Sequence, residues 1–238
     1  LNDNFTHIIN LVGSSNQVLE KKNKKSINTT HFESSKNIMN FFVEKKIHKF
    51  IQIGSAAEYG QKKIPHKENI KCLPISDYGV AKLKTTKHLL DLFTQRSFNG
   101  VVVRLFQVYG KKQDQEKIIP YILNNCLVNK KFKLTKGTQT RDFCYIEDVV
   151  RAIFLLLDKN EDINGKIYNV ASGKDISIKS LVSLIKNIVG SGKPIFGKKK
   201  IKTSEVDKSK ADINQIKKIG WRPKISLEKG INIILKDK

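Results

Sequence analysis

Short apolar runs alternate along this chain with longer segments in which apolar residues recur at helical spacing. The short runs span four to six residues and are rich in β-branched side chains, which predicts buried strands. Strands that alternate with helices predict an α/β fold, a doubly wound parallel sheet with helices on both faces. The predicted strands are His7–Val12, Phe50–Ile53, Val101–Phe106 and Ile167–Val170.

The segments of helical spacing predict six helices and two lobes. After Gly110 the regular alternation of apolar strands and helices ends. We therefore expect a larger Rossmann-like lobe over residues 1–112 and a smaller mixed α/β lobe over 113–238. The strand at Ile167–Val170 is also compatible with a return to the first sheet. Gly190–Lys200 is rich in Gly and Lys and predicts a loop. The predicted helices are Asn28–Lys46, Tyr78–Phe93, Lys117–Val128, Asp148–Leu157, Ser177–Val189 (capped by Ser177) and Ala211–Ile219.

Length and composition exclude several classes. A chain of 238 residues with 39% hydrophobic residues can bury a sizeable core. No apolar run approaches 18 residues and no N-terminal leader pattern is visible, so we expect no membrane association. Three widely spaced cysteines without a CxxC motif argue against a disulfide scaffold and a cysteine zinc site, and suit a cytoplasmic protein.

The net charge of +23 by itself suggests a nucleic-acid partner. The types of residue that produce this charge argue against such a partner. Only 5 of the 45 basic residues are Arg, and Arg is the side chain that best reads phosphates and bases. Lys, Ile and Asn are abundant together, which is typical of AT-rich coding sequence. We therefore expect no nucleic-acid partner, while the positive surface should attract small molecules that carry phosphate.

Two motifs could carry chemistry. In Tyr78-Gly79-Val80-Ala81-Lys82, positions i and i+4 share a helix face, so a lysine ammonium near the tyrosine hydroxyl would favour its phenolate form. Such a tyrosine can act as a general acid or base. Gly54–Gly60 (GSAAEYG) directly follows a predicted strand, which puts Ser55 at the carboxyl end of the sheet, where ligands bind. Each motif alone also fits a helix surface or a turn.

Together, these motifs and four further segments resemble the extended short-chain dehydrogenase/reductase family, the group of NAD-dependent nucleotide-sugar epimerases and dehydratases. The six segments occur in the family's order and cover nearly the whole chain. They are Gly54–Gly60, Tyr78–Lys82, Arg104–Gly110, Arg141–Asp148, Tyr168–Gly173, and Asp207–Ala211 with Ile219–Pro223.

The resemblance implies a role for each matched residue. Tyr78 would be the general acid/base, Lys82 would lower its pKa and bind the nicotinamide ribose, and Ser55 would hold the reacting oxygen. The cofactor would be NAD or NADP, the substrate a nucleoside-diphosphate sugar, and the setting the synthesis of polysaccharide precursors. The further residues implied are Leu11 and Gly54 at the cofactor, and Gln107 and Arg141 at the substrate, Arg141 on its diphosphate.

The chain departs from the family pattern at its beginning. It starts at Leu1 and contains no GxxGxxG or GxGxxG loop, so we expect an N-terminally incomplete Rossmann lobe that binds dinucleotide weakly by itself. Gly54 replaces the first Ser of the family's pair, and Gln107 replaces an Asn.

The residues after the second predicted strand reduce the number of possible reactions but do not select a single one. The 4,6-dehydratases carry Thr-Asp-Glu where this chain has Ser55-Ala56-Ala57, and alanine cannot transfer protons, which argues against dehydration. A 4-ketoreductase or a 4-epimerase remains, with a non-catalytic Rossmann binding protein as the alternative. The family implies a homodimer through helices at about residues 28–46 and 78–95. The histidines show no metal-ligand spacing, and Lys198–Lys200 is interpreted as a solvated loop or part of a nucleotide pocket.

Overall fold

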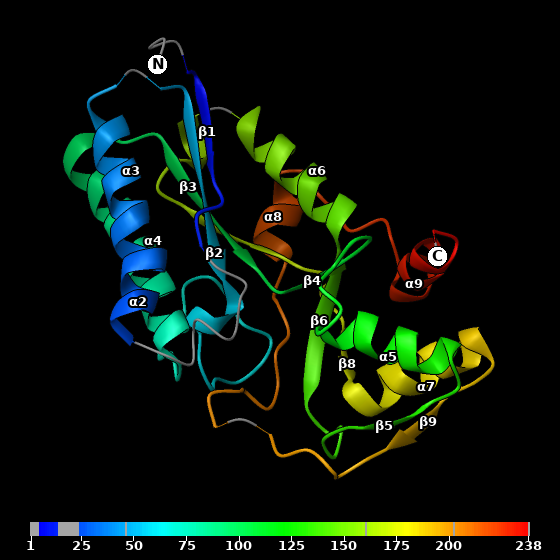
Figure 1. Cartoon of the computed structure of the whole chain (residues 1–238). Coiled ribbons are helices and arrows are strands. Elements are labelled where there is room, and N and C mark those ends of the chain that lie inside the picture. Colours follow the sequence, from blue (N-terminus) through cyan, green and yellow to red (C-terminus); the bar gives the residue numbers. More distant parts are fainter. Residues whose placement is uncertain (1–4, 14–23, 46, 160, 202, 238) are drawn as a thin grey trace.

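The computed structural model describes residues 5–13, 24–45, 47–159, 161–201 and 203–237 (Figure 1). Its elements, in chain order, are β1 (His7–Asn10), α2 (Lys24–Asn28), the π-helix η1 (Thr29–Glu33), α3 (Ser34–Val43), β2 (Lys49–Ser55), the 3-10 turn η2 (Ala56–Glu58), α4 (Asp77–Arg96), β3 (Gly100–Leu105), β4 (Gln107–Tyr109), α5 (Ile118–Leu127), β5 (Lys131–Lys133), β6 (Thr140–Tyr145), α6 (Ile146–Leu157), η3 (Glu161–Ile163), β7 (Ile167–Val170), β8 (Asp175–Ser177), α7 (Ile178–Val189), β9 (Lys193–Ile195), α8 (Asn214–Lys218) and α9 (Leu227–Leu235).

The main sheet has the order β1-β2-β3-β7, and all of its pairs are parallel. Helices α2, α3 and α4 cover one face, and α6 and α8 cover the other (Figure 1). Parallel strands covered on both faces must be apolar throughout, which explains the continuous runs read from the sequence. The predicted α/β fold with a parallel sheet is confirmed, and β7 joins this sheet beside β3.

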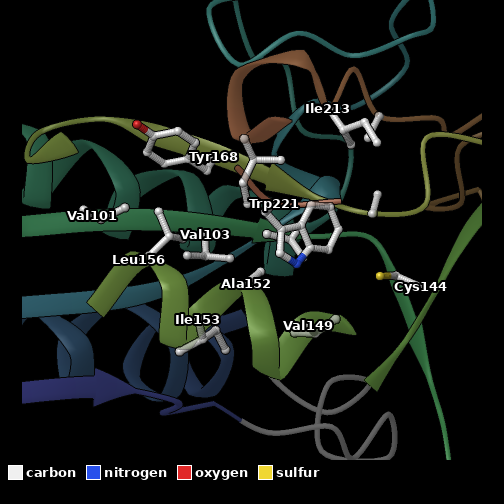
Figure 2. Close-up of a cluster of buried hydrophobic side chains, with 14 of the residues drawn as sticks. Val101, Val103, Cys144, Val149, Ala152, Ile153, Leu156, Tyr168, Ile213 and Trp221 are labelled. Atoms are coloured by element: carbon white, nitrogen blue, oxygen red, sulfur yellow. The ribbon is translucent and has the colours of Figure 1, made fainter. Parts of the chain in front are cut away.

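The core of the sheet is built from residues on both sides of position 112. Side chains of α6 lie against Val101 and Val103 of β3, with Trp221 beside Ala152 (Figure 2). The indole N–H of Trp221 donates to the Asp148 carbonyl at 3.0 Å, so this ring is a packing anchor. A second cluster on the opposite face joins α3, α4 and the strands. The boundary between lobes 1–112 and 113–238 stays a prediction.

The remaining elements form a second group around α5, α7 and α9. Beside them lie a three-stranded sheet of order β4-β6-β8 and a parallel pair, β5 with β9 (Figure 1). The buried residues of this group form a separate cluster from Tyr109 to Ile234. The Ser177 hydroxyl accepts from the Ser180 amide at the start of α7, so the predicted helix cap is confirmed.

Several sequence-based expectations need correction. The predicted loop Gly190–Lys200 contains β9, whose three residues are fixed by pairing with β5 rather than by any local pattern. The predicted helix Ala211–Ile219 is reduced to α8, because Ala211 forms a parallel β-bridge with His66 and the Asp212 amide donates to the His66 carbonyl, which holds this stretch outside the helix. The predicted helix Asn28–Lys46 is interrupted by the π-helix η1 and ends at Val43.

Candidate active site

Ser55 ends β2 at the carboxyl edge of the main sheet, where the sequence places it. Its backbone is extended (φ −148°, ψ 146°), and its hydroxyl oxygen accepts from the Ala57 amide at 3.2 Å, which begins the turn η2. The side chain is half-buried. Because ligands of open α/β sheets bind outside the carboxyl ends of the strands, the Ser55 hydroxyl is well placed for a substrate oxygen.

Tyr78 and Lys82 lie on the first turns of α4, which starts at a Ser76 cap. The helix approaches η2 so closely that a Cβ on Gly79 would lie 2.5 Å from the Ala57 carbonyl oxygen. The Lys82 ammonium donates to the Ile53 carbonyl of β2 at 3.0 Å. The two motifs separated in the sequence are therefore joined in space, with Tyr78 half-buried and Lys82 buried.

Burial dominates the electrostatics of Lys82. It is 4% exposed, and desolvation lowers its pKa because the charged form loses water. The carboxylate of Glu58 acts in the opposite direction and favours the ammonium. A buried lysine with a lowered pKa is a common feature of functional sites.

His31 belongs to this site, although no sequence pattern marks it. Its ring meets that of Tyr78 edge-on, with the centroids 4.9 Å apart. Only 2% of the residue is exposed, and Nδ1 has no hydrogen-bond partner within the described part of the chain. Burial, assisted by the charge of Lys82, lowers the pKa of His31 to about 4. His31 is therefore neutral at pH 7, and only the packing of η1 against α4 reveals it.

The other residues assigned to the cofactor lie at the ends of β1 and β2. Leu11 follows β1 and is 70% exposed, while Gly54 is buried. A Cβ added to Gly13, two residues beyond Leu11, would lie 2.8 Å from His31 Nδ1 and 3.8 Å from Lys82 Nζ. The chain leaving β1 therefore passes directly over the polar atoms that surround Lys82.

The two residues assigned to the substrate lie on neighbouring strands of the second sheet. Gln107 opens β4 and is exposed; it pairs in register with Phe143 of β6. Arg141 of β6 is buried, and its guanidinium donates to the Glu205 carboxylate at 2.5 Å. The sequence did not indicate this partner. An anion bound at Arg141 would have to compete with Glu205.

Two classes of feature are not found in the described ranges. No group of three or more His, Cys, Asp or Glu side chains is arranged to hold a metal ion there. None of the helices resolved in those ranges combines the length and apolarity needed to cross a bilayer.

Comparison with known proteins identifies the family. The model of the "NAD dependent epimerase/dehydratase family" matches residues 1–171, more than half of the chain. The chain belongs to this family. A putative UDP-glucose 4-epimerase of Methanocaldococcus jannaschii is 30% identical over 207 residues, which cover 84% of this chain and 66% of that protein. A CDP-abequose synthase of Salmonella muenchen is 32% identical over 134 residues, 56% of this chain and 46% of that protein.

Solved structures of nucleotide-sugar epimerases share the fold. A UDP-glucose 4-epimerase of Thermotoga maritima, solved with UDP-glucose, superposes with a TM-score of 0.89 at 25% identity, covering 97% of this chain and 76% of that chain. More distant curated relatives, at 28% identity, include dTDP-D-glucose 4,6-dehydratases of human and cattle. The chain thus spans two thirds or less of the curated relatives named here.

Proposed function

We propose that this chain carries the catalytic residues of an NAD(P)-dependent nucleotide-sugar epimerase or reductase that acts at C4 of the sugar. The observation that carries the proposal is the junction of β2 and α4. There, Lys82 of the Tyr78–Lys82 helix donates to the Ile53 carbonyl, two residues before Ser55. Membership of the family supports a nicotinamide cofactor and a nucleoside-diphosphate sugar as substrate.

The residues present fit the nicotinamide end of such a cofactor. An ammonium has three donor hydrogens, and the single hydrogen bond described for Lys82 uses one of them. Gly54 presents no side chain at the strand end, and Nδ1 of His31 is a buried polar atom for which the described residues supply no partner. A glycine-rich cradle for the pyrophosphate does not occur in the sequence, so we expect weak dinucleotide binding by this chain alone.

The bound nicotinamide would exchange hydride with C4, and the protein groups would handle the proton. The Ser55 hydroxyl would hold the C4 oxygen, while the Tyr78 phenolate would take the C4 hydroxyl proton during oxidation and, as the phenol, return it during reduction. The Lys82 ammonium would stabilise the phenolate that is needed before oxidation and that forms again after reduction. A positioned acid–base group of this kind contributes about 10²–10⁴-fold to the rate.

The side chains next to Ser55 favour epimerisation or reduction over dehydration. Ala56 and Ala57 occupy the turn after the strand, and neither can protonate a leaving hydroxyl. A 4,6-dehydratase, the activity named for some relatives, needs an acid and a base in addition to the tyrosine. The same Ser-Tyr-Lys set serves both a 4-epimerase and a 4-ketoreductase, so the reaction assay must separate these two.

The substrate and assembly assignments remain part of the proposal. Gln107 and Arg141 would contact the nucleotide sugar, with Arg141 exchanging its Glu205 partner for the diphosphate. A homodimer through α3 and α4 is supported by partly exposed apolar side chains on these helices, Phe41 at 57% and Phe93 at 38% exposed. We keep the cytoplasm as the expected location.

The test uses protein made from the complete reading frame, with NAD(P)H absorbance at 340 nm followed in the presence of nucleotide 4-keto-6-deoxysugars. Stoichiometric loss of reduced cofactor would identify a ketoreductase. No net change in absorbance, with conversion of an ordinary nucleotide sugar into its 4-epimer, would identify an epimerase. Activity in neither assay would favour a non-catalytic binding protein.

Tyr78→Phe tests the assignment of the acid–base residue. We expect a loss of turnover of at least about 100-fold, because the variant cannot transfer a proton. The matched control is Tyr121→Phe on α5, which removes a hydroxyl that donates to the Lys133 carbonyl of β5, away from β2 and α4. Equal turnover in Tyr78→Phe and wild type would show that the catalytic assignment is wrong.

A further inference from the structure

Glu58 is a fully buried carboxylate next to the candidate active site, and neither the sequence motifs nor the proposed reaction uses it. It ends the turn η2, three residues after Ser55, and is 0% exposed. Leaving an ionisable group in such a place is costly unless every oxygen is satisfied. The hydrogen bonds made by this carboxylate therefore indicate its role in the site.

One carboxylate oxygen is committed to Ser55. The backbone N–H of Ser55 donates to Glu58 Oε1 at 2.8 Å, while the Ser55 hydroxyl accepts from the Ala57 amide. Both ends of the turn are thus fixed at once, which restricts the direction of the Ser55 side chain. Glu58 thus holds the backbone N–H of Ser55, in addition to the pairing of Ser55 with Leu105 of β3.

The second oxygen reaches the two elements that flank β2. The Thr86 hydroxyl of α4 and the Arg104 Nε–H of β3 each donate to Glu58 Oε2 at 2.8 Å. Thr86 follows Lys82 by one helical turn, so it lies on the same face of α4. A single side chain therefore connects the end of β2, the helix that carries Tyr78 and Lys82, and the next strand.

The position of the Glu58 carboxylate requires a residue without a side chain at position 54. A Cβ added to Gly54 would lie 2.6 Å from Glu58 Oε1 and 3.1 Å from Val102 Cγ1, so a side chain at this position would displace the carboxylate. The glycine is where this chain departs from the serine expected by resemblance. Close approach to the buried carboxylate gives that departure a physical reason.

We propose that Glu58 is a positioning residue, which fixes the Ser55 peptide and sets the charge environment of Lys82 through a carboxylate anchored on Arg104. This inference rests on the proposed function of Ser55 and Lys82. The charged or titratable groups around Lys82 are Glu58 from η2, His31 from η1 and Tyr78 from α4 itself. Glu58 is the acidic member of this set, and its charge favours the ammonium.

The decisive variant is Glu58→Gln, which keeps the shape and removes the charge. Its amide cannot accept from Ser55 N–H and from Arg104 at the same time, so one of these bonds is lost. We expect kcat to fall about 100-fold, as for a small misplacement of a reacting group, with KM changed less than about threefold. We also expect the Lys82 ammonium to titrate at lower pH, followed by NMR of ¹³C-labelled lysine and assigned with Lys82→Arg.

The matched control is Thr85→Val. Thr85 neighbours Thr86 and is equally buried, but its hydroxyl donates to the carbonyls of His31 and Ala81 instead of to Glu58. This variant should lower the unfolding midpoint while leaving kcat and the Lys82 titration at their wild-type values. If Glu58→Gln behaves as Thr85→Val does, losing only stability, Glu58 is structural and the proposal is overturned.

A second variant keeps the test decisive if Glu58→Gln does not fold. Gly54→Ala keeps the Glu58 carboxylate but displaces its Oε1 atom, so this variant should lower kcat at least about tenfold. Wild-type kcat in Gly54→Ala would contradict the proposal. If the wild-type protein turns over no nucleotide sugar, the proposed function fails, but the titration of Lys82 still decides whether Glu58 sets its charge environment.

Discussion

We expect the protein to lose stability at acid pH because His31 is buried in its neutral form. The pKa of His31 is lowered from 6.5 to about 4 in the folded protein. Between these values the unfolded chain binds a proton that the folded chain does not, so stability falls as the pH falls. For a group with these two pKa values, the loss between pH 7 and pH 5 is about 2 kcal/mol.

The assay is urea unfolding at pH 7 and pH 5, in wild type and His31→Phe. Phenylalanine keeps a ring against Tyr78 and cannot titrate, and Nδ1 gives up no hydrogen bond that the described residues make. With an m-value of about 2–3 kcal/mol/M, the wild-type midpoint should fall about 0.7–1 M further than that of the variant. The pKa values of His66 and His88 are also lowered by burial, but both histidines are present in the two proteins and cancel.

Equal pH dependence in the two proteins would refute the assignment of a buried, neutral His31. A second check is Lys82→Met. Because the charge of Lys82 contributes to lowering the pKa of His31, its removal should raise that pKa and reduce the acid sensitivity. An unchanged or larger acid sensitivity in Lys82→Met would show that His31 and Lys82 are not coupled.

Three further substitutions test how the fold holds the site. Asp142→Asn should cost about 2–5 kcal/mol in urea unfolding, because the buried carboxylate accepts four hydrogen bonds and an amide can accept at only one of its two ends; a loss below about 1 kcal/mol would contradict this. Trp221→Phe should cost about 1–3 kcal/mol through the lost indole bond to Asp148 and lost packing, and an unchanged melting temperature would refute the anchor role. Gly60→Ala should lose more than about 2 kcal/mol, since φ is +69° and the new Cβ would lie 1.7 Å from a backbone oxygen. Gly190→Ala, at φ +80° with open space around it, is its control, and equal losses would remove the steric argument.

The sequence by itself determined the parallel sheet and the position of its helices. Strands such as Val101–Phe106 are buried on both faces, so their apolar runs are local and visible without a structure. The helix caps at Ser76 and Ser177 are local as well, since each hydroxyl accepts from an amide three residues away. Ser55 after β2, and Tyr78 and Lys82 one turn apart on α4, follow from the same short-range geometry.

Only the tertiary structure decided what surrounds these residues. Glu58 is an acidic residue in a turn, yet Arg104 and Thr86, which are distant in the sequence, donate to its carboxylate in the interior. His31 lies beside Tyr78 because η1 packs on α4. The strands β5, β8 and β9 have three residues each, too few to show a period, and exist through their partners. A contact between residues far apart in the chain leaves no pattern in either segment alone. Such contacts are therefore visible only in the tertiary structure.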